Sequence, residues 1–250
     1  MSHKRRTGLP YWHRGVQYYP DYKNECGPEG MRGGGFMKVN LRLVIPLAAL
    51  AVLSSASVRA ADRNPDAFSK QQIQGKLEYC KTCHGLAGQG YRGYFAMPRL
   101  AGQKPEYMAN QLRDFIERRR KNPVMFNVAH VLSPSMVTAL ADHFRDLDPA
   151  PYGGAPRDSL ALGKTIFETG LPESNVPACS ACHGPEAKGH AEIPRLAGQL
   201  YWYTIKTLAN WSKERGQGTT SDISAIMVPT THNLTQAQIA AVAAYVSYLK

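Results

Sequence analysis

From residue 61 onward the sequence contains an internal duplication, and each copy carries a C-x-x-C-H motif. Tyr79–Gly85 reads YCKTCHG, and Ala178–Gly184 reads ACSACHG. The letters PRLAGQ follow both motifs, at Pro98–Gln103 and again at Pro194–Gln199. Because the motifs recur in the same order, they indicate a duplicated unit of about 100 residues. The chain is therefore expected to fold into two similar domains.

The domain boundary is expected at residues 149–156, which contain three prolines and two glycines and read as a linker. The first domain then spans 61–148 and the second 157–250. In each domain Leu-Ser or Leu-Thr precedes an apolar run with the i, i+3, i+4, i+7 spacing of an amphipathic helix. These runs are Val137, Leu140, Ala141, Phe144 and Leu147, and Ile239, Val242, Ala243, Val246 and Leu249. Alternating strand patterns are scarce, so the fold class is predicted to be all-α.

C-x-x-C-H is the attachment signature of a c-type heme. Cys80 and Cys83, and likewise Cys179 and Cys182, are spaced to form thioethers with one porphyrin, and His84 and His183 then supply an imidazole to the iron. A disulfide would not account for the two histidines. A zinc site requires four ligands, whereas one motif supplies three at most. A thioredoxin-like motif requires a βαβ unit, which the sequence does not indicate. The sequence therefore predicts two covalently bound hemes c.

The sixth iron ligand is expected to recur in both copies. Met125 and Met227 each lie seven residues before the paired Leu132 and Leu234, and no other methionines correspond in this way. Thioether sulfur favours reduced iron, which suits an electron carrier. His130 and His232 lie near the same loops and are the alternative ligands.

The paired prolines Pro98 and Pro194 lie between the heme motif and the methionine loop. An axial histidine needs a partner for its second ring nitrogen, commonly a backbone carbonyl. A loop fixed by proline is a good way to hold such a carbonyl in place.

Residues 37–60 read as a secretory signal peptide. A basic start at Lys38 and Arg42 precedes an apolar core of 11 residues, Leu43–Leu53, and the small-x-small site ending at Ala60 predicts Ala61 as the mature N-terminus. The expected location is the periplasm. Residues 1–36 have no apolar periodicity and are interpreted as a non-native or disordered extension that contains Cys26, with translation starting at Met37. The alternative is a cytoplasmic extension on an uncleaved anchor.

The formal net charge of +11 overstates the charge of the exported part. Residues 1–60 hold nine Lys and Arg against three Asp and Glu, which leaves 21 basic and 16 acidic side chains, or +5, in residues 61–250. That excess suits acidic redox partners or peripheral contact with a membrane surface. No basic stripe interleaved with aromatic residues supports nucleic acid binding. The dense cluster at Arg118–Lys121 is expected to be a solvated helix end, with a docking patch as the alternative.

These motifs together resemble the class I cytochromes c, in particular the tandem diheme cytochrome c4 group, over nearly all of residues 65–250. The resemblance implies two domains packed about a pseudo-twofold axis, and it places Gly75 and Gly163 where the first helix of each domain crosses the last. It also implies a shuttle of single electrons between membrane respiratory complexes, toward a terminal oxidase. The alternative is an electron-accepting subunit of a periplasmic dehydrogenase. A diheme peroxidase would need an open distal site, which the matched methionines argue against, so no catalytic residue is assigned.

Overall fold

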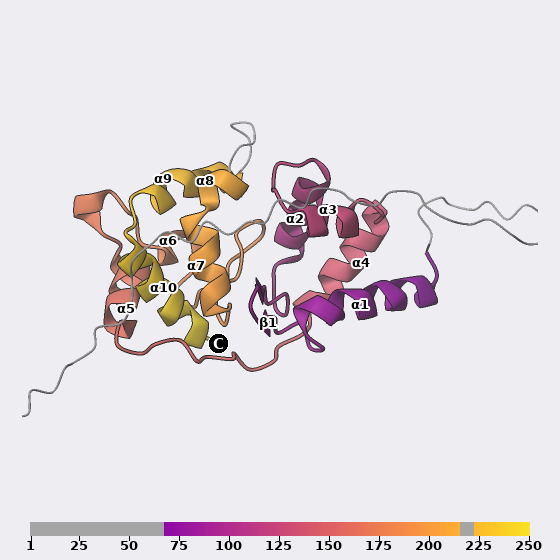
Figure 1. The fold of residues 1–250 in the computed structure, drawn as a ribbon, viewed down its shortest axis with the longest axis horizontal. Coiled ribbons are helices and arrows are strands. Elements are labelled where there is room, and N and C mark those ends of the chain that lie inside the picture. Colours follow the sequence, from indigo (N-terminus) through magenta and orange to yellow (C-terminus); the bar gives the residue numbers. More distant parts are fainter. Residues whose placement is uncertain (1–67, 216–222) are drawn as a thin grey trace, which may run out of the picture. The chain divides into compact units, whose positions relative to one another are not determined.

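The structure is a computed structural model that describes residues 68–215 and 223–250. The expected signal peptide, the cleavage site before Ala61 and the extension with Cys26 lie outside these residues. Within them the regular secondary structure is helical apart from isolated bridges and one hairpin of two short strands, β1 (Tyr91–Arg92) and β2 (Ala96–Met97). The predicted all-α class is confirmed, and Figure 1 shows the helices in chain order.

The first half begins with a single long helix that ends in its C-x-x-C-H motif. Ser69 caps this helix, α1, through a reciprocal capping box with Gln72, which satisfies N–H groups that have no partner inside the helix. Gly85, at a φ of 84°, ends α1 in a conformation that suits glycine. The helices of this half are α1 (Lys70–His84), α2 (Pro105–Ile116), α3 (Pro123–Ala129) and α4 (Pro134–Arg145).

The second half divides the corresponding first helix in two. An α-helix, α5, ends before Gly170, and a loop closed by a bridge between Leu171 and Val176 leads to a short helix that carries the motif. The elements are α5 (Leu160–Thr169), η1 (Pro172–Ser174), α6 (Ser180–His183), α7 (Tyr201–Ala209), α8 (Trp211–Glu214), η2 (Ile223–Ile226), α9 (Met227–His232) and α10 (Gln236–Tyr248).

The last helix of each half starts where the sequence predicts. The Ser133 hydroxyl accepts a hydrogen bond from the Met136 N–H, and the Thr235 hydroxyl accepts one from the Gln238 N–H, each over 3.3 Å. Both hydroxyls satisfy a free N–H of the first turn. The predicted apolar stripes face inward, because the first four residues of each are buried, while Leu147 and Leu249 at their ends are partly buried.

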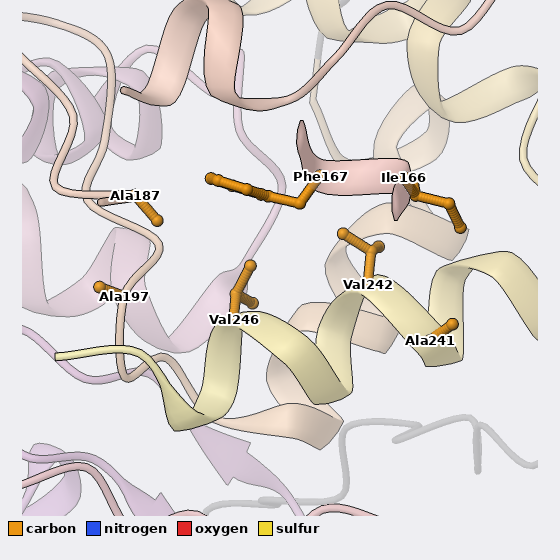
Figure 2. Packing of buried hydrophobic residues seen from close by; sticks show 7 residues of the cluster. All are labelled: Ile166, Phe167, Ala187, Ala197, Ala241, Val242 and Val246. Carbon is orange, nitrogen blue, oxygen red and sulfur yellow. The ribbon is translucent and has the colours of Figure 1, made fainter. Parts of the chain in front are cut away.

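The core of the second half lies where α5 meets α10. Figure 2 shows Ile166 and Phe167 on α5 facing the apolar side of α10, with alanines from two neighbouring loops closing the cluster. The cluster consists of Ile166, Phe167, Ala187, Ala197, Ala241, Val242 and Val246. The first half has a smaller cluster of Leu77, Met108, Leu140, Ala141 and Phe144.

The predicted role of the paired glycines holds for Gly163 and is wrong for Gly75. A Cβ on Gly163 would lie 2.1 Å from the Ala241 carbonyl oxygen, so α5 and α10 touch backbone to backbone there. A Cβ on Gly75 would meet nothing within 4 Å. The reason is the spacing to the heme motif, because Gly75 lies five residues before Cys80 on one continuous helix, whereas Gly163 lies sixteen before Cys179. The two glycines are aligned by sequence but are not equivalent in structure.

The proline- and glycine-rich stretch at 149–156 contains no helix or strand. Backbone carbonyls of this stretch accept a hydrogen bond from each half. Arg99 Nη1 of the first half donates to the Pro149 oxygen over 2.8 Å, and the Tyr248 hydroxyl of the second half donates to the Ala155 oxygen over 2.6 Å. No single helix among the described residues is long and apolar enough to cross a membrane, and only α3 with α4, bent by 112° between them, reach that length and composition as a pair.

Candidate heme attachment sites

The three motif residues of the first half lie on the last turns of α1. Cys80 is partly buried against the apolar cluster, Cys83 is exposed, and His84 is buried. One helix therefore presents two thiols and an imidazole one turn apart, as attachment to a single porphyrin requires.

In the second half the same groups sit at a short helix held by the core. Cys179 precedes α6 and packs against the apolar cluster, while Cys182 is exposed and His183 is buried. Gly184, at a φ of 78°, ends α6 as Gly85 ends α1. The two halves thus reach the same arrangement from different local structures.

No disulfide joins the four motif cysteines. Burial raises the pKa of the Cys80 thiol and raises the pKa of Cys179 to about 11. Among residues 68–215 and 223–250 no group of three or more His, Cys, Asp or Glu side chains is placed to hold a metal ion. The thiols therefore fit covalent attachment better than zinc.

The two motif histidines have the hydrogen bonding that an iron ligand needs. His84 Nδ1 lies 2.9 Å from the Pro98 carbonyl oxygen, and His183 Nδ1 lies 2.9 Å from the Pro194 carbonyl oxygen. This is the carbonyl contact that the proline pair predicts. The Nδ1–H is thereby engaged, and Nε2 is the nitrogen left to bind a metal.

Burial lowers the pKa of both motif histidines, and the hydrogen bond to the proline carbonyl offsets this only in part. The charged ring is therefore disfavoured at neutral pH. A neutral imidazole is the form that coordinates iron, so burial and hydrogen bonding together fit a heme at both motifs.

The two predicted methionines each lie in the first turn of a short helix that precedes the last helix of their half. Met125 lies in the first turn of α3, where its N–H donates to Asn122 Oδ1 over 3.0 Å, and Met227 is the first residue of α9. Both side chains are partly buried. Each methionine comes from a different element than its histidine, so the two would approach the iron from separate parts of the fold.

The alternative histidines are exposed. The His130 ring stacks on Phe126 with centroids 5.3 Å apart, and its Nδ1 lies 3.1 Å from the Phe126 carbonyl oxygen of its own helix. His232 ends α9 and is also exposed. Partial burial favours the methionines over these histidines as iron ligands.

The basic cluster at Arg118–Lys121 is not simply a solvated helix end. Arg120 Nη2 donates to the Tyr203 hydroxyl of the other half over 2.8 Å, and Arg215 Nη2 donates to the same oxygen over 2.8 Å. Burial raises the pKa of the Tyr203 phenol, but the two guanidiniums outweigh it and lower that pKa to about 7. The expectation is therefore wrong for Arg120, and no local pattern indicates it because Tyr203 lies 83 residues away.

Two helical halves, each with a C-x-x-C-H motif whose histidine is held by a proline carbonyl, define a diheme c-type cytochrome. Comparisons with known proteins agree. The cytochrome c family model matches residues 160–250. Cytochrome c4 of Thiocapsa roseopersicina is 36% identical over 173 residues, which cover 68% of this chain and 86% of that protein.

Two further proteins extend the comparison. The thiosulfate dehydrogenase electron acceptor of Thiomonas intermedia is 34% identical, over 84% of this chain and 92% of that protein. The crystal structure of reduced recombinant cytochrome c4 from Pseudomonas stutzeri superimposes with a TM-score of 0.64 at 28% identity, over 74% of this chain and 100% of that one. The chain belongs to the cytochrome c4 family. It is an electron-transfer protein that binds two hemes c.

Proposed function

We propose that this cytochrome works in the periplasm and carries single electrons between membrane respiratory complexes, toward a terminal oxidase. The observation that supports this most is the matched pair of buried histidines, each with Nδ1 on a proline carbonyl and Nε2 free. A bound heme supplies the one-electron iron couple. The chain supplies attachment, ligands and burial.

We assign the same ligand set to each heme. Cys80 and Cys83 attach the first heme and Cys179 and Cys182 the second, while His84 with Met125 and His183 with Met227 bind the two irons. A neutral nitrogen and a soft sulfur on each iron favour the reduced state and leave no open position for a substrate. Such ligation suits outer-sphere electron transfer rather than peroxide chemistry.

The direct test measures electron flow to an oxidase. Chemically reduced, mature protein is mixed with membranes that contain a terminal oxidase, and oxidation of the hemes is followed by visible absorbance with and without cyanide. The proposal expects rapid oxidation that cyanide blocks. Slow, cyanide-insensitive oxidation would contradict the oxidase as acceptor.

The second candidate is the electron acceptor of a periplasmic dehydrogenase, which the Thiomonas relative favours because it is named as the acceptor of thiosulfate dehydrogenase. Here the oxidised protein is mixed with thiosulfate and a purified thiosulfate dehydrogenase. Reduction of both hemes within seconds, absent when thiosulfate is omitted, would support this function. The two tests are independent, since a shuttle can pass both and a dedicated acceptor passes the second alone.

The intact mass of the protein purified from cells tests whether it is exported and cleaved as proposed. The intact protein from cells should have the mass of residues 61–250 plus two hemes, because the small-x-small site ends at Ala60. A mass that retains residues 1–36 would overturn both the cleavage site and the start at Met37.

A further inference from the structure

The peptide group after Pro98 makes hydrogen bonds on both of its sides. Its carbonyl oxygen lies 2.9 Å from His84 Nδ1, and its N–H, which belongs to Arg99, donates to Gln199 Oε1 over 2.9 Å. Gln199 belongs to the other half of the chain. One amide therefore connects the axial histidine of the first half to a glutamine of the second.

The second half repeats this arrangement in the opposite direction. The Pro194 carbonyl oxygen lies 2.9 Å from His183 Nδ1, and the Arg195 N–H of the same peptide group donates to Gln103 Oε1 over 2.8 Å. The duplication that repeats PRLAGQ thus gives each glutamine a partner in the other copy.

Both glutamine side chains are buried and held in one orientation by hydrogen bonds. Gln103 is 6% exposed and Gln199 is 8% exposed. Each Nε2 donates back to the carbonyl of the arginine it holds, over 3.0 Å to Arg195 and 3.1 Å to Arg99. Each Oε1 also accepts the N–H of the residue after its own glutamine, over 2.9 Å at both Lys104 and Leu200. An amide with oxygen on two N–H groups and nitrogen on a carbonyl can take only one orientation.

Hydrogen bonds on the two sides of one amide strengthen each other, because an acceptor on the N–H draws electron density toward the carbonyl oxygen. A more negative carbonyl oxygen takes a larger share of the Nδ1 proton and makes the imidazole a stronger electron donor to the iron. A stronger donor stabilises ferric iron and lowers the reduction potential.

We infer that Gln199 and Gln103 are positioning residues that tune the hemes crosswise, Gln199 acting on the first heme through His84 and Gln103 on the second through His183. The inference rests on the proposed ligand assignment of these histidines. It makes the potential of each heme depend on a contact from the other half.

The test compares Gln199→Leu with Gln103→Leu in the mature diheme protein. Two quantities are measured for each heme, its midpoint potential and the proton chemical shift of its histidine Nδ1–H in the reduced protein. Each Nδ1–H is assigned by its contact with the neighbouring Pro98 or Pro194. Gln199→Leu should raise the potential of the first heme and move the His84 resonance upfield, with the second heme unchanged. Gln103→Leu should do the same to the second heme and His183 alone.

Tyr203→Phe is the control for a loosened interface. It removes the hydroxyl that Arg120 and Arg215 share between the halves but leaves both glutamine contacts in place. It should leave both Nδ1–H resonances where they are. If Tyr203→Phe reproduced the shifts, or if each leucine variant changed the heme of its own half or both hemes alike, the crosswise role would be wrong.

If the variants fail to acquire their hemes, a measurement on the unchanged protein still tests the inference. A scalar coupling through the hydrogen bond should join the Arg99 nitrogen to the Gln199 side-chain carbonyl carbon, and its absence would overturn the inference. The ligand assignment fails separately, since a His84 that does not bind iron would lack the large ring-current shift of a heme ligand in the unchanged protein.

Discussion

At the scale of single residues, each motif histidine has its proline carbonyl nearby in the chain, whereas the glutamine behind that carbonyl comes from the other half. The thiols, the histidines and the proline carbonyls follow from two repeated motifs because they lie close together along the chain. Gln199 could not be found in this way, since it lies 100 residues from the Arg99 N–H that it holds. The expectation for Arg120 is wrong for the same reason, because its partner Tyr203 belongs to the other half.

Removing a single methionine tests the proposed sixth ligand. Met125→Ala should abolish about half of the weak sulfur-to-iron band at the red edge of the ferric visible spectrum, and Met227→Ala the other half, because the proposal gives each iron its own sulfur. His130→Ala and His232→Ala are matched controls in the same loops and should leave the band intact. If the unchanged protein lacked this band, or kept it after both methionines were replaced, the assignment of Met125 and Met227 would be wrong.

Acid should release the two proposed histidine ligands, His84 and His183, only below the ordinary pKa of histidine. Burial depresses the pKa of His84 and His183 in the folded chain below the value of about 6.5 that they have when unfolded. The stability they contribute is therefore complete above about pH 6.5 and is lost as the pH falls further, through the folded pKa. A visible-absorbance titration should show the low-spin spectrum intact at pH 6.5 with its transition at lower pH. A midpoint at or above 6.5 would contradict this.

At the scale of secondary structure, capping residues and apolar spacing predict helix starts well. Ser133 and Thr235 cap the last helices as expected because a cap depends on the next three residues alone. The β1–β2 hairpin and the equivalence of the two first helices depend on spacing between distant elements. For this reason the sequence predicts Gly163 correctly and Gly75 wrongly.

The two glycines give a matched pair of variants. Gly163→Ala should lower the free energy of unfolding by about 1–3 kcal/mol, because its Cβ would press into the Ala241 carbonyl and force α5 away from α10. Gly75→Ala should raise it by roughly 0.5–1 kcal/mol, since alanine is the better helix former and has free space. Thermal denaturation followed by circular dichroism measures both. Equal destabilisation by the two changes would show that α1 is also crossed closely by another helix.

At the scale of the whole molecule, each half has a small apolar core, so its heme is expected to contribute to the stability of the fold. The buried cluster of the first half has five residues, against seven in the second. In a unit of about 90–100 residues the fraction of surface buried is modest, so a cofactor that completes the core contributes to folding.

Preventing attachment of one heme tests this dependence. Cys80→Ser combined with Cys83→Ser should disorder the first half while the second, with its own heme and core, stays folded. Limited proteolysis should then cut within residues 68–148 and spare 157–250, and circular dichroism should lose part of its helical signal. Cys179→Ser with Cys182→Ser is the reciprocal variant. A first half that stays helical and resists protease without heme would show that its polypeptide core is sufficient.

The reciprocal glutamine contacts also constrain how this gene can diverge. A substitution at Gln103 removes one hydrogen bond within its own copy, from Lys104, and two to Arg195 in the other copy, so most of the damage falls in the copy that did not mutate. The two repeats should therefore coevolve. A recombinant that joins a first half from one species to a second half from another should fold and transfer electrons only when the PRLAGQ loops of its two halves are compatible.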